Sequence, residues 1–350
     1  MTLHNPIEQE SVRVGIVVIG RNEGERLLRC LQSCASTAAS VVYVDSGSTD
    51  GSLDLAQGQG ATVTQLDTSA PFSAARARNL GYKRIREISP GVQIVQFVDG
   101  DCELAADWFP YAVDSMRLHT DVAIVAGRLK ERFPDASIYN RVGEIEWNLS
   151  ESGEVDSVGG IFIIRCDAFD GVGGFNPTVT AGEEPELCLR LLRQGWRIVR
   201  LPREMATHDL SMTRFSQWWR RMVRGGYGSM DVGHRFGVTE FSKNNLRVLA
   251  WTCWLAAFAV SGALAAITGS SQLKAATTLL LCIWLAMLVR IALRMLKKQY
   301  AWDISIAYAL FMAIAFLPQA VGQACYFGDR LRKHSARLIE YKDNMPSIDR

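Results

Sequence analysis

Three long apolar segments after residue 247 limit the possible folds of this chain more than any other feature. Residues 248–268 and 304–327 contain no charged side chain, and residues 275–293 contain only Arg290. Each segment is long enough to cross a hydrocarbon core of about 30 Å as a helix. Helices buried inside soluble domains are usually shorter, so these segments predict a membrane region at residues 247–328.

The charges around the apolar segments predict which side of the membrane they face. Lys243 and Arg247 precede the first segment, and Arg294, Lys297 and Lys298 follow the second. Because Lys and Arg accumulate on the cytoplasmic side, both flanks are predicted to be cytoplasmic. The basic tail, residues 329–350, would be cytoplasmic only if the third segment did not cross. Pro318 and Gly322 interrupt that segment, so it either spans or re-enters the membrane, and re-entry is favoured.

The chain before residue 247 alternates short apolar runs with helical patterns. Strands are predicted at residues 12–19, 41–44, 61–66, 93–98 and 157–165, and helices around Leu27 and over 74–88. This alternation predicts an α/β domain with a mainly parallel sheet. Ligands of such sheets bind beyond the carboxyl ends of the strands.

Three of the predicted strands end in polar loops that carry acidic residues. These loops are Asn22-Glu23, Asp45-Ser46 and Asp99-Gly100-Asp101. Because parallel strands present their carboxyl ends at one edge of a sheet, we expect the loops to lie close together. Asp99 and Asp101 could hold one Mg²⁺ or Mn²⁺ ion, and Gly100 would let a bulky ligand approach the backbone. Alternatively, these residue types simply form turns and cap helices.

A further pair of acids, Glu183 and Glu184, precedes a predicted helix that has Pro185 in its first turn. A carboxylate at this position could act as a general base. It could also serve only to stabilise the positive end of the helix dipole.

Other features disfavour several classes of function. The formal net charge of +2 over 350 residues gives no indication of a nucleic-acid partner. The eight cysteines include no Cys-x-x-Cys pair, so neither a zinc framework nor a disulfide scaffold is predicted, and a reducing cytoplasm is favoured. No Gly-x-Gly-x-x-Gly follows the first strand and no Gly-Lys-Ser/Thr occurs, which argues against a dinucleotide-binding domain and a P-loop.

Four motifs, in order along the chain, resemble inverting glycosyltransferase family 2. They are Ile19-Gly20-Arg21-Asn22-Glu23, Val44-Asp45-Ser46-Gly47-Ser48-Thr49-Asp50-Gly51, Ala75-Arg76-Ala77-Arg78-Asn79-Leu80-Gly81 and Asp99-Gly100-Asp101. The resemblance implies a GT-A catalytic domain over residues 1–209, with a Rossmann-like mixed sheet.

The resemblance also implies how a nucleotide-sugar is held. It assigns the base and ribose to Asp45, Ser46, Ile19, Asn22 and Glu23, and the sugar and metal–diphosphate to Arg78, Asp99, Gly100 and Asp101. Uridine is the commonest base in the family. Residues 183–187 resemble the Glu-Asp-x-Glu-Leu motif of the family, which implies that Glu184 is the general base. Since glutamate replaces the aspartate of that motif, Glu183 is the second choice.

Two later features have competing interpretations. His208 could complete the metal site, although a lone histidine is more often a packed or surface residue. Arg220 and Arg221 lie in residues 210–246, a segment rich in Arg and Trp. They loosely resemble the Gln-x-x-Arg-Trp-like element near the diphosphate, and the segment could also be an interfacial helix with aromatics at the headgroup level.

The combined features predict a multi-pass enzyme of the bacterial inner (plasma) membrane with a cytoplasmic catalytic domain. It would move a sugar, from a UDP-linked donor by family resemblance, to a lipid-linked saccharide or growing polysaccharide, with inversion. Its predicted cofactor is Mg²⁺ or Mn²⁺, and membrane lipid is a further partner. One alternative is a metal-dependent nucleotidyltransferase, which does not account for Glu184. Another is a non-catalytic sugar-nucleotide-binding scaffold, which the complete set of acids disfavours.

Overall fold

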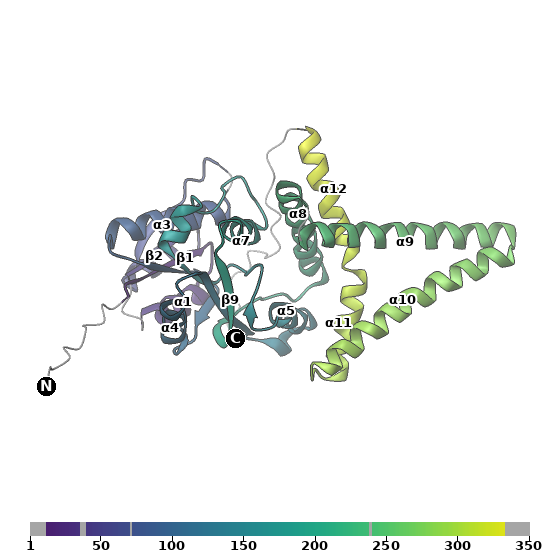
Figure 1. Cartoon of the computed structure of the whole chain (residues 1–350), viewed down its shortest axis with the longest axis horizontal. Coiled ribbons are helices and arrows are strands. Elements are labelled where there is room, and N and C mark those ends of the chain that lie inside the picture. The colour runs from purple at the N-terminus through teal and green to yellow at the C-terminus, as the bar shows by residue number, and fades with distance from the viewer. Residues whose placement is uncertain (1–11, 36–39, 71, 238–239, 333–350) are drawn as a thin grey trace. The chain divides into compact units, whose positions relative to one another are not determined.

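The computed structural model describes residues 12–35, 40–70, 72–237 and 240–332 (Figure 1). The chain divides into two compact units. The first comprises the chain up to Leu129, Ser150–Asn176 and Leu187–His208. The second comprises Lys130–Leu149, Pro177–Glu186 and the chain from Asp209 onward.

A nine-stranded mixed sheet forms the centre of the first unit. Its strand order is β3-β2-β1-β4-β8-β6-β9-β5, with β7 paired to β9. The strands are β1 (Val14–Gly20), β2 (Ser40–Asp45), β3 (Thr62–Gln65), β4 (Ile94–Asp99), β5 (Cys102–Leu104), β6 (Val122–Glu131), β7 (Gly153–Glu154), β8 (Phe162–Arg165) and β9 (Arg197–His208). Strands β1 to β4 are parallel, whereas β8 is antiparallel to both β4 and β6. The expectation of a mainly parallel sheet therefore holds only for the half formed by β1 to β4. The mixed sheet that the family resemblance implied is confirmed.

Helices with one apolar face accompany the strands of this unit. They are α1 (Glu25–Ala35), α2 (Ser52–Gly58), α3 (Ala74–Ile88), α4 (Trp108–Leu118), α6 (Cys166–Gly171) and the later part of α7 (Glu183–Arg193). Helix α3 contacts β1 and β2, and a Cβ atom on Gly81 would lie 2.3 Å from Cγ1 of Val17. Only glycine permits this close packing, which sets the distance of α3 from the sheet.

The register of the parallel strands brings the three polar loops to one edge of the sheet. Gly20 pairs with Asp45 across β1 and β2, and Ile19 pairs with Asp99 across β1 and β4. All three strands thus end at the same level. The predicted convergence of the three strand-end loops is confirmed.

The second unit is helical. It contains α5 (Ile138–Asn148), the short 3₁₀ helix η1 (Pro134–Ala136), α8 (Phe215–Phe236), α9 (Glu240–Thr268), α10 (Ser271–Lys297), α11 (Trp302–Ile314) and α12 (Phe316–Arg332). Helices α9 and α10 pack as a hairpin that turns at Gly269, where φ is +69° (Figure 1). Helix α12 runs against α8, where a Cβ on Gly226 would lie 2.2 Å from the Gln319 carbonyl oxygen.

Three segments of the described chain are long and apolar enough to cross a membrane, as the sequence predicted. They are Phe241–Thr268, Ser271–Lys297 and Trp302–Arg332. The third differs because it is divided at Ala315 into α11 and α12, and 44% of its most apolar window is buried, against 11% and 6% in the others. Pro318 lies in the first turn of α12, where no helical hydrogen bond is lost. The predicted basic tail lies outside the described residues from 333 onward.

Candidate functional site

Asp45 is a buried carboxylate at the end of β2 that organises the loop after it. The Tyr43 hydroxyl donates to its Oδ1 at 3.0 Å, and the N–H groups of Gly47 and Ser48 donate to its Oδ2 at 2.9 Å each. Burial, and then the charge of Asp45, raise the pKa of Tyr43 far above its ordinary value. Tyr43 therefore remains a hydrogen-bond donor at physiological pH. The hydrogen bonds from Gly47 and Ser48 show that Asp45 forms a turn, which was the alternative to a ligand-binding role.

Asn22 links the loop after β1 to the loop after β2. Its backbone has φ of +55°, a left-handed conformation that asparagine tolerates. Its N–H donates to Ser48 Oγ at 2.9 Å, and its Oδ1 accepts from the Thr49 N–H at 2.7 Å. Its neighbour Glu23 pairs with Arg26 at 2.8 Å. The first two predicted loops are therefore one hydrogen-bonded structure.

Asp99, at the end of β4, is oriented by a buried arginine of α3. The Arg78 side chain is 2% exposed, and its Nη2 lies 3.0 Å from Asp99 Oδ1. The Arg78 guanidinium also lies 5.4 Å from the centre of the Phe175 ring. Because the Asp99 side chain is 37% exposed, it can face both Arg78 and a ligand. Its predicted role as a second metal ligand stays a prediction.

Gly100 brings the loop after β4 against the end of β1. Its N–H donates to the Ile19 carbonyl at 2.8 Å. A Cβ atom here would lie 3.2 Å from Cγ of Glu23 and 3.3 Å from the Ile19 oxygen. The absence of a side chain at Gly100 thus allows the loop after β4 to pack closely against Glu23 and the end of β1.

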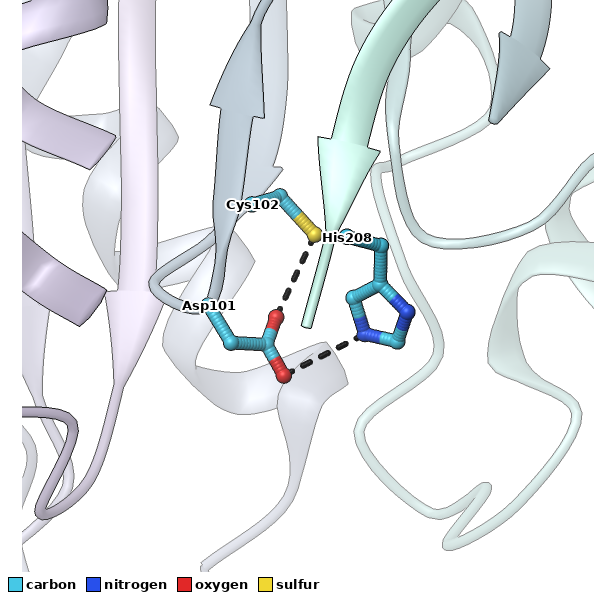
Figure 2. Close-up of side chains that lie close together, drawn as sticks. All are labelled: Asp101, Cys102 and His208. Carbon is cyan, nitrogen blue, oxygen red and sulfur yellow. Dashed lines mark hydrogen bonds and ion pairs between the residues drawn. The ribbon is translucent and has the colours of Figure 1, made fainter. Parts of the chain in front are cut away.

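Asp101, Cys102 and His208 converge at the antiparallel pair of β5 and β9, which ends the strand order of the sheet (Figure 2). Cys102 of β5 lies directly opposite His208 of β9, so both side chains project from one face of the sheet. His208 Nε2 lies 3.2 Å from Asp101 Oδ2, and Cys102 Sγ lies 3.2 Å from Asp101 Oδ1. The three potential ligand atoms are within 4.8 Å of one another.

This group fits a divalent cation by the chemistry of its donors. A carboxylate and an imidazole nitrogen are common ligands of divalent metals. Asp101 and His208 are 107 positions apart in sequence, and the pairing of β5 with β9 brings them together. Cys102 was missed in the sequence, although its position next to Asp101 was a usable signal. Asp99 is not a member of this group.

In the second unit, the buried carboxylate of Glu131 holds the residues that follow His208 in the chain. Glu131 is 1% exposed and accepts from the N–H groups of Phe133 and Leu210 at 3.1 and 3.2 Å, and from Asn140 Nδ2 at 3.1 Å. The Asn140 Oδ1 accepts from the Met212 N–H at 3.1 Å. Glu131 and Asn140 thereby position the segment that follows His208.

Replacing Glu131 with alanine is expected to lower the free energy of unfolding by about 3 kcal/mol, because three hydrogen bonds to its carboxylate, two of them buried, would be lost. Thermal unfolding of the detergent-solubilised chain measures the effect. Asp135→Ala, which removes an exposed carboxylate of η1, is the matched control and should change little. An equal response of the two variants would show that the Glu131 hydrogen bonds do not stabilise the fold.

Glu183 and Glu184 open α7 and belong to the second unit. Glu183 is 3% exposed, whereas Glu184 is half-buried. Gly182 precedes them with φ of +82°, and a Cβ added there would lie 3.2 Å from Val232 of α8. Glu184 is therefore the more accessible of the two carboxylates, and its role as general base stays a prediction.

The predicted arginines of α8 have different surroundings. Arg220 is exposed, whereas Arg221 forms an ion pair with Glu146 of α5. Trp218 is fully buried, and its ring centre lies 5.0 Å from that of Phe311 in α11. Trp218 therefore packs inside the unit and does not lie on an exposed aromatic face.

Comparison with known proteins agrees with this arrangement. Residues 15–173 match the sequence model of glycosyl transferase family 2. Comparison with curated proteins gave no match. Among solved structures, a mannosyltransferase from Pyrobaculum calidifontis, in complex with GDP-Man and Mn²⁺, matches with a TM-score of 0.58 at 19% identity. That match covers 89% of this chain and 87% of the other.

Two further solved structures match smaller parts of the chain. S. aureus TarS has a TM-score of 0.45 at 17% identity, over 62% of this chain and 40% of that protein. Glucosyl-3-phosphoglycerate synthase from Mycobacterium tuberculosis, with Mn²⁺ and UDP-glucose, has 0.45 at 15% identity, over 65% and 80%. This chain thus spans only two fifths of the TarS chain. The mixed sheet and the P. calidifontis match identify the GT-A fold that the motifs implied.

Proposed function

Because residues 15–173 match the model of glycosyl transferase family 2, we propose that this chain transfers a sugar from a nucleotide-sugar to a membrane-borne acceptor. The acceptor is a lipid-linked saccharide or a growing polysaccharide, and the anomeric configuration is inverted. The observation that carries this proposal is the alignment of Asp45, Asp99 and the ends of β1 and β2 at one sheet edge.

In this proposal the donor lies along that edge. Asp45 and Ser46, with Ile19, Asn22 and Glu23, bind the base and ribose. Arg78, Asp99, Gly100 and Asp101 face the sugar and diphosphate. The hydrogen bonds that fix Asn22 to Ser48 and Asp45 to its own loop support it, since they hold these groups in place before a ligand arrives.

The metal of this reaction is proposed to bind Asp101 and His208. When bound, a divalent cation offsets the charge that develops on the departing nucleoside diphosphate. Arg78 adds a fixed positive charge that requires no rearrangement during the reaction. The Arg78 side chain holds Asp99, which is proposed to contact the sugar. Contact with the metal is a second proposed role of Asp99.

Glu184 is the proposed general base. It takes the proton of the acceptor hydroxyl while that oxygen bonds to the anomeric carbon and the bond from that carbon to the diphosphate breaks. Attack opposite the leaving group inverts the configuration. Its half-buried position supports this choice over Glu183. Arg220 and Arg221 are proposed to act near the diphosphate, Arg220 being the more accessible.

A membrane region on the same chain favours an acceptor that is itself in the membrane. Helices α9 and α10 expose most of their apolar side chains, as a spanning hairpin would. Near the end of α10, exposed Arg290, Arg294 and Lys297 lie on the surface beside Ala286, Val289 and Leu293. Cations beside apolar side chains suit anionic membrane lipid.

The donor screen that tests this function reads the release of nucleoside diphosphate by membranes containing the chain. UDP-linked sugars come first because of the family resemblance, and GDP-mannose is included because the P. calidifontis structure holds it. Transfer to an extracted lipid fraction identifies the acceptor class. Pyrophosphate release would identify a nucleotidyltransferase instead, and no turnover with any donor would favour a non-catalytic binding protein.

The third apolar segment is expected to re-enter the inner membrane, leaving the catalytic domain and the C-terminus in the cytoplasm. Helix α12 packs along α8, whose arginines, such as Arg220, Arg224 and Arg235, would be costly in hydrocarbon. Reporter fusions after Arg332 should therefore give a cytoplasmic signal, and fusions at Gly269 a periplasmic one. A periplasmic signal after Arg332 would show that the segment spans.

A further inference from the structure

We propose that Cys102 is a third ligand of the metal and makes this site select zinc-class cations (Zn²⁺, Co²⁺, Cd²⁺) over Mg²⁺. The Asp101–Cys102–His208 group then offers one oxygen, one sulfur and one nitrogen (Figure 2). The proposal concerns the metal of the proposed transfer reaction, but its optical readout does not depend on turnover.

The strand pairing places the sulfur where a metal could reach it. Cys102 and His208 are cross-strand partners in the β5–β9 pair, and Asp101 directly precedes β5. Figure 2 shows the Cys102 sulfur and the His208 ring both directed toward the Asp101 carboxylate. The backbone hydrogen bonds of the two strands hold the spacing of Cys102 and His208, and Asp101 adjoins the first residue of β5.

The distances between the donors suit a small cation. Metal–ligand bonds of about 2.0–2.3 Å at tetrahedral angles separate neighbouring donors by about 3.3–3.8 Å. The Asp101–His208 and Asp101–Cys102 contacts are each 3.2 Å, and no pair of ligand atoms exceeds 4.8 Å. The two contacts use different oxygens of Asp101, so side-chain shifts of up to about 1 Å would seat an ion, with the fourth position open to a diphosphate oxygen.

Burial strengthens the argument for all three donors. Cys102 is fully buried, Asp101 is 5% exposed, and the His208 side chain is 12% exposed. Away from water, the attraction between a cation and the negatively charged ligands is stronger. On binding, the Sγ–H bond of Cys102 breaks as the Sγ–metal bond forms, and the proton leaves to solvent.

Ligand softness decides which cation is favoured. Thiolate and imidazole suit zinc-class metals, whereas Mg²⁺ requires near-octahedral oxygen ligands. Asp101 and His208 alone would discriminate weakly between these ions. The sulfur of Cys102 is therefore the group that determines metal specificity.

Titration of the full-length, detergent-solubilised chain with Co²⁺ tests this assignment. Wild type should develop a thiolate-to-cobalt charge-transfer band that saturates at one Co²⁺ per chain. The band should disappear in Cys102→Ser and in His208→Ala, and Zn²⁺ affinity should fall by at least about 100-fold in Cys102→Ser. Cys188→Ser, which alters another fully buried cysteine, should keep the band. No band in wild type, or an unchanged band in Cys102→Ser, would overturn the proposal.

X-ray absorption of the zinc-loaded wild type tests the same ligand without a variant that might unfold. The proposal expects one sulfur at about 2.3 Å from zinc, and a shell of nitrogen and oxygen only would contradict it. A sulfur ligand in a chain without turnover would leave this inference standing and remove the proposed function. Turnover by a chain whose zinc has only oxygen and nitrogen ligands would support the proposed function and contradict this inference.

Discussion

Asp101→Ala is expected to lower kcat for sugar transfer by about 10³-fold, because it removes a carboxylate that the proposed metal requires. Asp101 has direct contact with both other members of the metal group. Its loss would leave His208 without the acid beside it. The rate of nucleoside diphosphate release at saturating donor measures the effect.

The matched control for this variant is Asp107→Ala, which removes an exposed acid of the same unit. Asp107 pairs only at the surface, with Arg203 at 3.2 Å, and such pairs contribute little. Its turnover should stay within about twofold of wild type. Chelation of the metal should reproduce the Asp101→Ala loss, and added divalent metal should restore wild type but not the variant. Wild-type turnover by Asp101→Ala would refute the metal assignment.

Glu184→Gln is expected to lower kcat by about 10²- to 10⁴-fold, the range associated with loss of a general base. Glutamine keeps the size and most hydrogen-bonding capacity of the side chain but cannot take the proton. Donor binding does not need that proton transfer, so the KM for the nucleotide-sugar should remain close to wild type. Steady-state kinetics with donor and acceptor varied separately give both parameters.

Glu183→Gln is the matched comparison, since it makes the same chemical change one residue earlier. Because Glu183 is 3% exposed, its replacement should act mainly on stability and be visible in thermal unfolding. A large kcat loss in Glu183→Gln alone would transfer the role of base to that residue. Turnover at the wild-type level in both variants would exclude this helix start as the source of the base.

Local sequence patterns predicted much of the first unit. Helix α3 has the predicted bounds, Ala74–Ile88, because its apolar residues recur at helical spacing after the Ser73 cap. Strand β4 is displaced by a single residue from the predicted 93–98. The strand predicted over 157–165 is only Phe162–Arg165, since Gly159 and Gly160 contribute no side chain to a sheet.

Contacts between distant segments could not be predicted in this way. The antiparallel half of the sheet depends on pairings such as β5 with β9, which local patterns do not encode. The engagement of Arg78 with Asp99 likewise requires α3 and β4 to be placed together first. The sequence predicted an interruption of the third apolar segment near Pro318, and the break lies at Ala315. It did not predict the dense packing of α12 on α8.

The sequence by itself determined the strand-end acids, the apolar segments and the family to which the first domain is similar. These are local properties, because a strand, a spanning helix or a motif is written in consecutive residues. Only the tertiary structure decided that His208 lies beside Asp101 and Cys102, and that Asp99 lies with Arg78. The reason is physical: strand register sets which side chains meet, and register depends on the packing of the whole sheet.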